Sequence, residues 1–165
     1  MPGTPTSSRA AAAGGLFDAY AFVRDEKADG TAGGTSTLGS WQTRTLNAEV
    51  FDPDGIVTLA ANQFTLGAGS YFIVARAPGF NVGTHMVRIQ NVTDATTVGE
   101  GASCDSATGH NDHATVAGRT TIAAAKAFEL QHQSESTRIN DGFGTATTFA
   151  VTTEVYAEVW IYREA

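Results

Sequence analysis

One segment of the chain, Cys104 to His113, gathers residue types that often bind metals or act in catalysis. His110 and His113 are three positions apart, so they could share a transition metal if the segment folded back, with Cys104 or Asp105 completing the site. An exposed polar loop, or a loop that contacts an external partner, accounts for the same residues without a metal. We therefore predict no metal site and treat the segment as a candidate recognition loop.

No enzyme motif accompanies this segment. The sequence has no Gly-x-Ser-x-Gly elbow, Walker loop, dinucleotide fingerprint or His-Glu-x-x-His helix. Cys104 with a histidine as base lacks an evident oxyanion hole and substrate cleft. A polysaccharide depolymerase would need a placed carboxylate pair, and nothing in the sequence pairs Glu129, Glu154 or Glu158. We predict that the chain is not an enzyme, with no catalytic residue and no cofactor.

Two other short motifs have structural explanations. Asp52-Pro53-Asp54-Gly55 offers two carboxylates but lacks the further oxygen ligands of a calcium site. Because proline presets φ and glycine accepts a positive φ, it predicts a turn. Asn91-Val92-Thr93 matches a glycosylation acceptor, but we interpret it as a strand end and turn.

The composition favours a small β domain. Of 165 residues, 10 are Lys or Arg and 17 are Asp or Glu, so the net charge is −7, which disfavours a nucleic-acid-binding surface. Only 16% of the residues are charged, and 18 are glycine. The lone Cys104 excludes an intramolecular disulfide, and no apolar run is long enough for a signal-peptide core or a membrane span.

We divide the chain into an arm and one domain. Residues 1–15 are rich in Pro, Gly, Ser, Thr and Ala and cannot form a core. We expect them to be a flexible arm that anchors the protein to a partner. Residues 16–165 are expected to form the folded domain.

Short runs with a period of two predict strands throughout this domain. The expected strands are 16–24, 41–51, one or two within 56–66, 71–77, 85–92, two within 120–133, and a final one. We expect a Gly/Thr/Ser loop over 30–39 and a polar loop over 93–113. The pattern fits an immunoglobulin-like sandwich and a jelly roll equally well.

The final segment is apolar on both faces. Phe149, Val151, Val155, Ala157, Val159 and Ile161 are expected on the core face, and Tyr156, Trp160 and Tyr162 on the other. Such a strand must be covered twice, and in a single small domain the second cover is best supplied by another subunit. Tyr20 and Phe22 could join these aromatic residues; a sugar-stacking platform is the alternative interpretation.

The order of several motifs resembles the trimeric jelly rolls typified by the globular heads of complement and tumour necrosis factor. That family has a Leu-Asn strand end, then a Phe-Thr pair, then a Gly-x-Tyr-aromatic strand. The matching residues are Leu46-Asn47, Phe64-Thr65 and Gly69-Ser70-Tyr71-Phe72, followed by Val87-Arg88-Ile89-Gln90-Asn91, Phe128-Glu129-Leu130-Gln131 and the closing strand 155–162. The resemblance spans about 16–164.

This resemblance implies an all-β jelly-roll sandwich of two antiparallel sheets that assembles as a homotrimer, with the first and last strands facing the threefold axis. The implied trimer interface comprises Tyr20, Phe22, Tyr156, Trp160 and Tyr162. The segments 43–47, 91–94 and 128–132 look most like stand-alone members encoded by tailed bacteriophages. No collagen-like stalk or cysteine pair is present, so the animal immune roles do not transfer.

We therefore expect a non-enzymatic virion protein, displayed as head decoration or a head fibre, attached through its arm to other virion proteins. A possible host surface glycan would contact the distal loop residues Asp105, His110, Asn111, Asp112 and His113. No nucleic acid partner and no membrane insertion are expected. The alternatives are a tail-fibre receptor-binding tip and a stand-alone lectin-like carbohydrate-binding protein.

Overall fold

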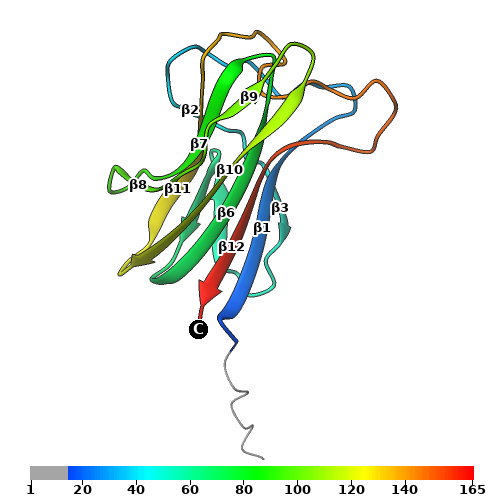
Figure 1. The fold of residues 1–165 in the computed structure, drawn as a ribbon. Coiled ribbons are helices and arrows are strands. Elements are labelled where there is room, and N and C mark those ends of the chain that lie inside the picture. Colours follow the sequence, from blue (N-terminus) through cyan, green and yellow to red (C-terminus); the bar gives the residue numbers. More distant parts are fainter. Residues whose placement is uncertain (1–14) are drawn as a thin grey trace, which may run out of the picture.

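The computed structural model of the protein describes residues 15–165, and the remainder of the predicted arm lies outside this range. The described chain forms two packed antiparallel sheets (Figure 1). The twelve strands of this part are β1 (Phe17–Lys27), β2 (Gln42–Thr43), β3 (Ala48–Phe51), β4 (Val57–Ala60), β5 (Gln63–Leu66), β6 (Gly69–Phe80), β7 (Gly83–Asn91), β8 (Thr96–Glu100), β9 (Cys104–Ser106), β10 (Asn111–Ile122), β11 (Lys126–Ser134) and β12 (Glu154–Glu164).

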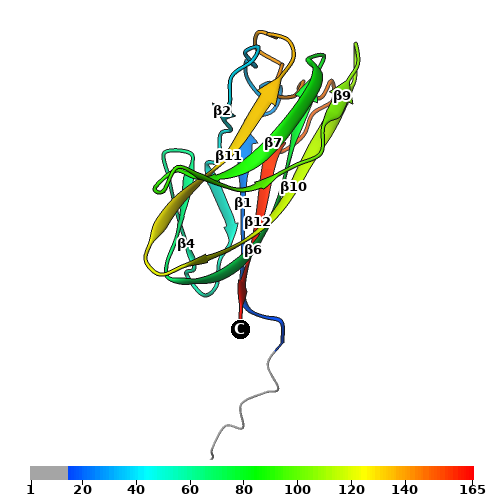
Figure 2. The ribbon, with the colours of Figure 1, turned by 60° about the vertical axis from the view of Figure 1, so that its left-hand side comes forward.

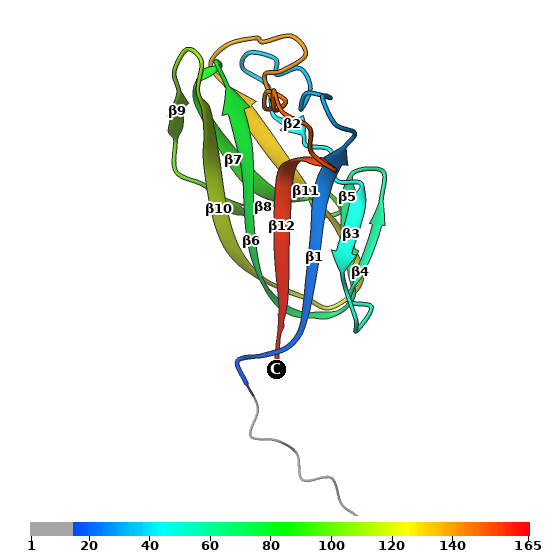
Figure 3. The ribbon, with the colours of Figure 1, turned by 90° about the vertical axis from the view of Figure 1, so that its right-hand side faces the viewer.

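The first sheet has the strand order β10-β6-β12-β1-β3, and Figure 3 shows it face on. The second sheet follows the path β4-β5-β11-β7-β8, with β2 beside β11 and β9 beside β7. The first and last long strands, β1 and β12, are hydrogen-bonded neighbours at the centre of the first sheet.

Alternation along each strand fills the core between the sheets. The first sheet turns small residues inward, among them Ala19, Ala21 and Ala157. The second sheet contributes larger ones, such as Phe64 and Phe128, whose ring centroids lie 5.6 Å apart. The inward residues are almost fully buried because period-two patterning presents one side of each sheet to the other.

The local turns form as predicted. The Asp52 carbonyl accepts a hydrogen bond from the Gly55 amide at 3.3 Å, and Gly55 has φ +62°. The Asp52 carboxylate also accepts hydrogen bonds from the amides of Ile56 and Val57. Asn91 and Asp94 bond to each other in the turn after β7. The segments 56–66 and 120–133 each contain two strands, as expected.

Two predictions about the chain path are wrong. The expected polar loop 93–113 contains β8, β9 and the start of β10. Their residues lack apolar alternation, and backbone pairing with β7 and β6 places them in the sheets instead. Phe149 and Val151 lie before β12, and Phe149 is 69% exposed. Glu154 holds this preceding loop by accepting hydrogen bonds from Thr147 and from the Gly30 amide.

A buried arginine links the two sheets to the loops at one end of the sandwich. The Arg44 side chain is fully buried, and its amino groups donate to the carbonyls of Pro78 and Phe143, each at 2.9 Å. Its guanidinium carbon lies 4.2 Å from the centroid of the Phe143 ring. Burial lowers the pKa of Arg44 to about 9, so the group is still charged at neutral pH.

Two buried histidines continue this network. Arg44 can only donate, so His132 Nδ1 accepts its hydrogen bond at 2.9 Å and the His132 proton lies on Nε2. His132 Nε2 lies 2.9 Å from His85 Nδ1, which accepts in turn. Burial, with the charge of Arg44, lowers the pKa of His132 well below its usual value, and burial also lowers that of His85. Both rings are therefore neutral in the folded protein at pH 7.

Replacing Arg44 by Met should strongly destabilise the fold. The substitution leaves two carbonyls and the His132 ring without their buried donor, and breaking such a network typically costs about 3–5 kcal/mol. Urea unfolding at one fixed protein concentration measures the effect. Arg119→Met is the control, because its side chain is 60% exposed and pairs with Glu164 at the surface, where a loss under about 1 kcal/mol is expected. Equal losses in the two variants would contradict the role of Arg44.

The buried histidines predict acid sensitivity. Their folded pKa values lie below those of the unfolded chain, so the unfolded state takes up protons first as the pH falls below about 6.5. The unfolding free energy should then fall by about 1.4 kcal/mol per pH unit for each neutral buried histidine. Above about pH 6.5 the histidines are neutral in both states and no longer lower the unfolding free energy.

Urea titrations between pH 5 and 8 measure this slope. His132→Gln keeps an acceptor for Arg44 and a donor for His85. It should reduce the slope of unfolding free energy against pH by the contribution of one proton, about 1.4 kcal/mol per pH unit. Comparing the variant with wild type also cancels the contribution of Asp25, which is present in both proteins. Burial raises the pKa of Asp25, so its protonation affects the unfolding free energy in the opposite sense. An unchanged slope in His132→Gln would show that His132 is not the group responsible.

Candidate functional site

The outer surface of the first sheet carries a group of aromatic side chains. Tyr20 and Phe22 of β1 lie directly opposite Tyr162 and Trp160 of β12 in the strand register. The ring centroids of Phe22 and Trp160 are 5.2 Å apart and nearly parallel, and those of Tyr20 and Tyr162 are also 5.2 Å apart. Because residues inward on the same strands form the core, these rings point away from it.

Three phenylalanines that the sequence analysis did not assign extend this surface. Phe17 lies 5.1 Å from Tyr162 and Phe51 lies 5.4 Å from Tyr20, measured between ring centroids, and Phe72 of β6 stacks on Phe17. Phe17 and Phe51 are 41% and 48% exposed. We call these seven residues the aromatic face: Phe17, Tyr20, Phe22, Phe51, Phe72, Trp160 and Tyr162. Among these three, Phe72 has a signal in the sequence, because the expected strand 71–77 carries apolar residues at successive positions and so on both of its faces.

Ion pairs frame the aromatic face. Arg76 pairs with Glu158 and lies over the Trp160 ring, with 5.6 Å between the guanidinium carbon and the ring centroid. At the opposite end of the strands, Arg119 donates twice to the Glu164 carboxylate, at 2.6 and 2.7 Å. An apolar centre with a charged rim is the usual organisation of a protein interface. Since these charges are already paired, covering the face would not leave them without partners.

Tyr156 does not belong to this face, and its assignment to the predicted interface is wrong. It is only 3% exposed, and its hydroxyl donates to the Thr31 carbonyl at 2.8 Å. A Cβ on Gly144 would lie 2.4 Å from the Tyr156 ring, so the loop backbone packs directly against it. Burial raises the pKa of Tyr156 to about 12. The residue fixes the loops above β12 and offers almost no surface to another subunit.

The predicted recognition residues lie at the opposite end of the sandwich from the C-terminus (Figure 2). Asp105 lies on β9, and Asn111, Asp112 and His113 begin β10. These four and His110 are all exposed. The turn between the strands is closed by a hydrogen bond from the His110 amide to the Ala107 carbonyl at 3.0 Å. Because β9 pairs with β7 of the second sheet and β10 pairs with β6 of the first, the fold presents these side chains together on a connection between the two sheets, which we call the distal connection 104–113.

The surrounding loops are tied to each other through the backbone. The Gly33 amide donates to the Gly144 carbonyl at 2.8 Å, and the Phe143 amide donates to the Gly34 carbonyl at 3.0 Å. A Cβ on Gly33 would lie 2.3 Å from the Phe143 carbonyl oxygen, so only glycine allows this approach. The distal connection 104–113 lies beside these loops, because the Thr145 amide donates to Asn111 Oδ1 at 3.2 Å.

Within residues 15–165, no group of three or more His, Cys, Asp or Glu side chains is placed to hold a metal ion. Over the same residues, no helix has the length and apolar character needed to cross a membrane.

Comparisons with known proteins show the fold. Neither a protein-family model nor a curated protein matches the chain. Two crystal structures of murine APRIL, at pH 8.0 and pH 5.0, align with TM-scores of 0.54 and 0.53 and identities of 8% and 5%. They cover 88% and 87% of this chain and 98% of APRIL. The globular domain of zebrafish complement 1qA protein aligns over 88% of this chain and 96% of its own, with 13% identity and a TM-score of 0.49.

These likenesses bear on architecture alone, because the identities are low. Together with the two antiparallel sheets they show that the protein has the jelly-roll fold of the tumour necrosis factor type. The expected fold class is thereby confirmed.

Proposed function

We propose that the protein is a non-enzymatic structural component of a tailed phage or phage-like particle, displayed on the particle as a homotrimer. The single observation that carries the trimer is the aromatic face, which leaves seven large rings on the outside of the first sheet. Monomeric proteins seldom expose so continuous an apolar surface. The resemblance of the sequence to trimeric jelly rolls implies that this sheet faces the threefold axis.

The geometry supports a threefold contact of ordinary interface type. Aromatic residues and arginine are enriched in the buried centres of protein interfaces. Here Phe22, Trp160 and Arg76 form a stacked group on neighbouring strands. A closed ring of three copies would cover each aromatic face and leave the second sheet on the outside.

The particle assignment has a different basis. The segments 43–47, 91–94 and 128–132 resemble stand-alone phage-encoded members, and we propose that residues 1–15 attach the trimer to other virion proteins. A display role is supported by the position of the distal connection 104–113, which lies at the end of the sandwich away from Leu16, the residue next to the arm, and from the C-terminus. Head decoration or a head fibre is the proposed location, with the distal connection 104–113 directed at the host.

Light scattering tests the trimer directly. The purified chain should have three times its monomer mass of 17.2 kDa at micromolar concentration, and Trp160→Asp should shift the mass to that of the monomer. A charge without a partner in a desolvated interface costs several kcal/mol. Phe149→Asp is the matched control, because Phe149 is 69% exposed and lies outside the aromatic face; it should remain trimeric. A monomeric wild-type chain would refute the proposal.

The proposed host recognition predicts a separate effect, on the rate of adsorption to host cells. Immunogold electron microscopy should find this chain on purified particles, both as wild type and with His110, Asp112 and His113 changed together to Ala. The triple variant should adsorb at least tenfold more slowly to host cells, since the substitutions remove side-chain hydrogen-bonding groups in each of three subunits. Asp54→Ala with Thr58→Ala, both exposed elsewhere, should adsorb normally. Unchanged adsorption of the triple variant would leave capsid decoration without host contact.

A further inference from the structure

The outer surface of the second sheet carries a regular row of polar side chains. In the register of β7 and β11, Gln90 lies opposite Glu129, Arg88 opposite Gln131, and Met86 opposite Gln133. The residues between them, such as Val87, Ile89 and Leu130, are fully buried in the core. The alternating residues therefore face outward. We call these six outward residues, Met86, Arg88, Gln90, Glu129, Gln131 and Gln133, the polar ladder.

Hydrogen bonds hold the centre of the polar ladder in a fixed arrangement. Glu129 accepts from Thr43, Gln63 and Gln131 at 2.7 to 2.9 Å, and Gln131 accepts from Arg88 Nε at 2.9 Å. Burial by itself would raise the pKa of Glu129, but these three donors outweigh it and lower the pKa. The carboxylate is thus charged and ordered, and the amides of Gln63 and Gln131 have set orientations.

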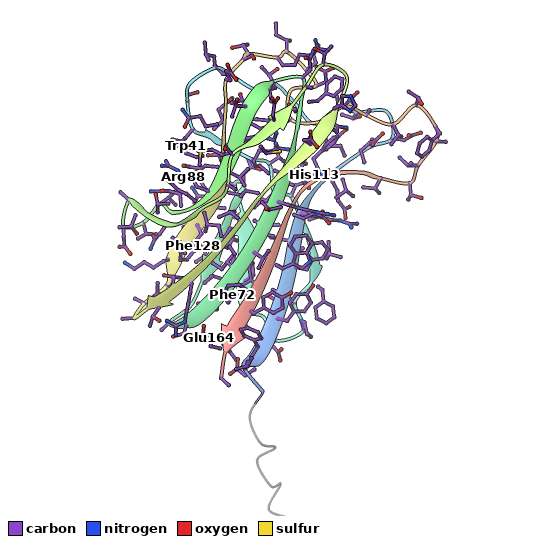
Figure 4. All side chains as sticks on the ribbon, in the orientation of Figure 1. Trp41, Phe72, Arg88, His113, Phe128 and Glu164 are labelled. Carbon is purple, nitrogen blue, oxygen red and sulfur yellow. The ribbon has the colours of Figure 1, made fainter. Side chains whose placement is uncertain are left out.

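Trp41 completes this part of the surface. The Arg88 guanidinium carbon lies 4.2 Å from the centroid of the Trp41 ring, and Figure 4 shows the two side chains together on the β7 side of the sandwich. Arg88 takes part in none of the ion pairs within residues 15–165. Its Nε is used by Gln131, and Trp41 orients the plane of the guanidinium, so its terminal amino groups are presented as a pair of donors.

A hollow of about 360 Å³ lies at the distal end of the polar ladder. Leu38, Thr84, Met86, Ser103, Gln133 and Glu135 contribute to its lining. Met86 and Gln133 belong to both features, so the hollow and the ladder form one continuous surface. Leu38 and Met86 give it an apolar floor between polar groups, and Leu38 is 59% exposed.

We propose that the polar ladder, Trp41 and this hollow form a binding site for a neutral oligosaccharide. Sugars present hydroxyls that both donate and accept, and they present apolar C–H faces. The site offers donors from Arg88 and the glutamine amides, an acceptor on Glu135, and apolar contact from Leu38, Met86 and Trp41, while the buried Glu129 holds the amides of Gln63 and Gln131 in place. From Thr84 in the hollow to Gln90 at the far end of the polar ladder, the strand β7 advances by three two-residue steps, or about 20 Å. This length suits a chain of about four hexose rings.

The negative charge of this surface is the reason that we propose a neutral oligosaccharide. Glu129 and Glu135 lie on this surface, and Glu100 of β8 lies opposite Arg88 in the strand register. Three carboxylates and one guanidinium thus belong to this part of the second sheet, and the chain as a whole has a net charge of −7. This field repels a polyanion, while hydroxyl groups can use the donors and the carboxylates alike.

The site is separate from the proposed trimer contact and from the residues proposed for host recognition. It lies on the second sheet, whereas the aromatic face lies on the far side of the first sheet. All of its residues come from a single subunit. Binding can therefore be measured on the purified chain without a particle, and its failure would leave the proposed trimer and virion role unaffected.

Isothermal titration calorimetry with maltotetraose, cellotetraose and mannotetraose tests the proposal, and tetragalacturonate is the acidic comparison. At least one neutral tetrasaccharide should bind with a submillimolar Kd, and tetragalacturonate should bind more weakly. Trp41→Ala and Arg88→Gln should each weaken binding at least tenfold. Arg119→Gln, on the first sheet, should bind like wild type. Thermal unfolding of each variant verifies the fold, and Arg88→Gln keeps the test valid if Trp41→Ala does not fold.

Two outcomes would overturn the proposal. If none of the neutral tetrasaccharides binds the wild-type chain, the surface is not an oligosaccharide site of the proposed kind. If tetragalacturonate is the tightest ligand, or if the folded Arg88→Gln variant binds as well as wild type, the assigned chemistry is wrong.

Discussion

The charged group of Arg44, buried between the sheets, is the interaction on which the distal end of the molecule depends. One guanidinium reaches the Pro78 carbonyl at β6, the Phe143 carbonyl in a loop and the His132 ring on β11. These groups come from three distant parts of the chain. Because each needs a donor once buried, the sheets and the loop can close only with Arg44 in place. The ordered loops that flank the distal connection 104–113 follow from this closure.

On β1 of the first sheet, small side chains point into the core and large aromatic side chains point outward. On β1 the inward residues are Ala19, Ala21 and Val23, while the outward ones include Tyr20 and Phe22. On this strand the larger side chains therefore face away from the subunit's own core. Since burial of apolar area is the main favourable term in association, this side of the sandwich is the one that gains most from a neighbouring subunit.

The two outer surfaces differ in chemistry, and this difference organises the proposed functions. The aromatic face stacks rings and pairs its rim charges internally, which suits close contact with a like surface. The polar ladder retains unengaged donors on Arg88 and ordered amides, which suits a hydrated ligand. Assembly through the first surface would leave the second exposed three times around the axis. The weak affinity expected of one sugar site could then be multiplied by avidity.

The sequence by itself determined the period-two strands, the Asp52–Gly55 turn and the outward direction of Tyr20, Phe22, Trp160 and Tyr162. These features depend on residues next to each other in the chain, so local alternation and turn chemistry are sufficient to predict them. The motif order also predicted the fold class. Phe72 was within reach, because the strand that contains it is apolar on both faces.

Only the tertiary structure decided which side chains are covered. Tyr156 shares the alternation of Trp160, yet Thr31 and Gly144 bury it. Strands β8 and β9 have no apolar pattern, and they form because β7 offers its backbone as a partner. The pairing of Trp41 with Arg88 joins residues 47 positions apart in the sequence. Such contacts depend on how distant segments pack, and a local pattern contains no record of that packing.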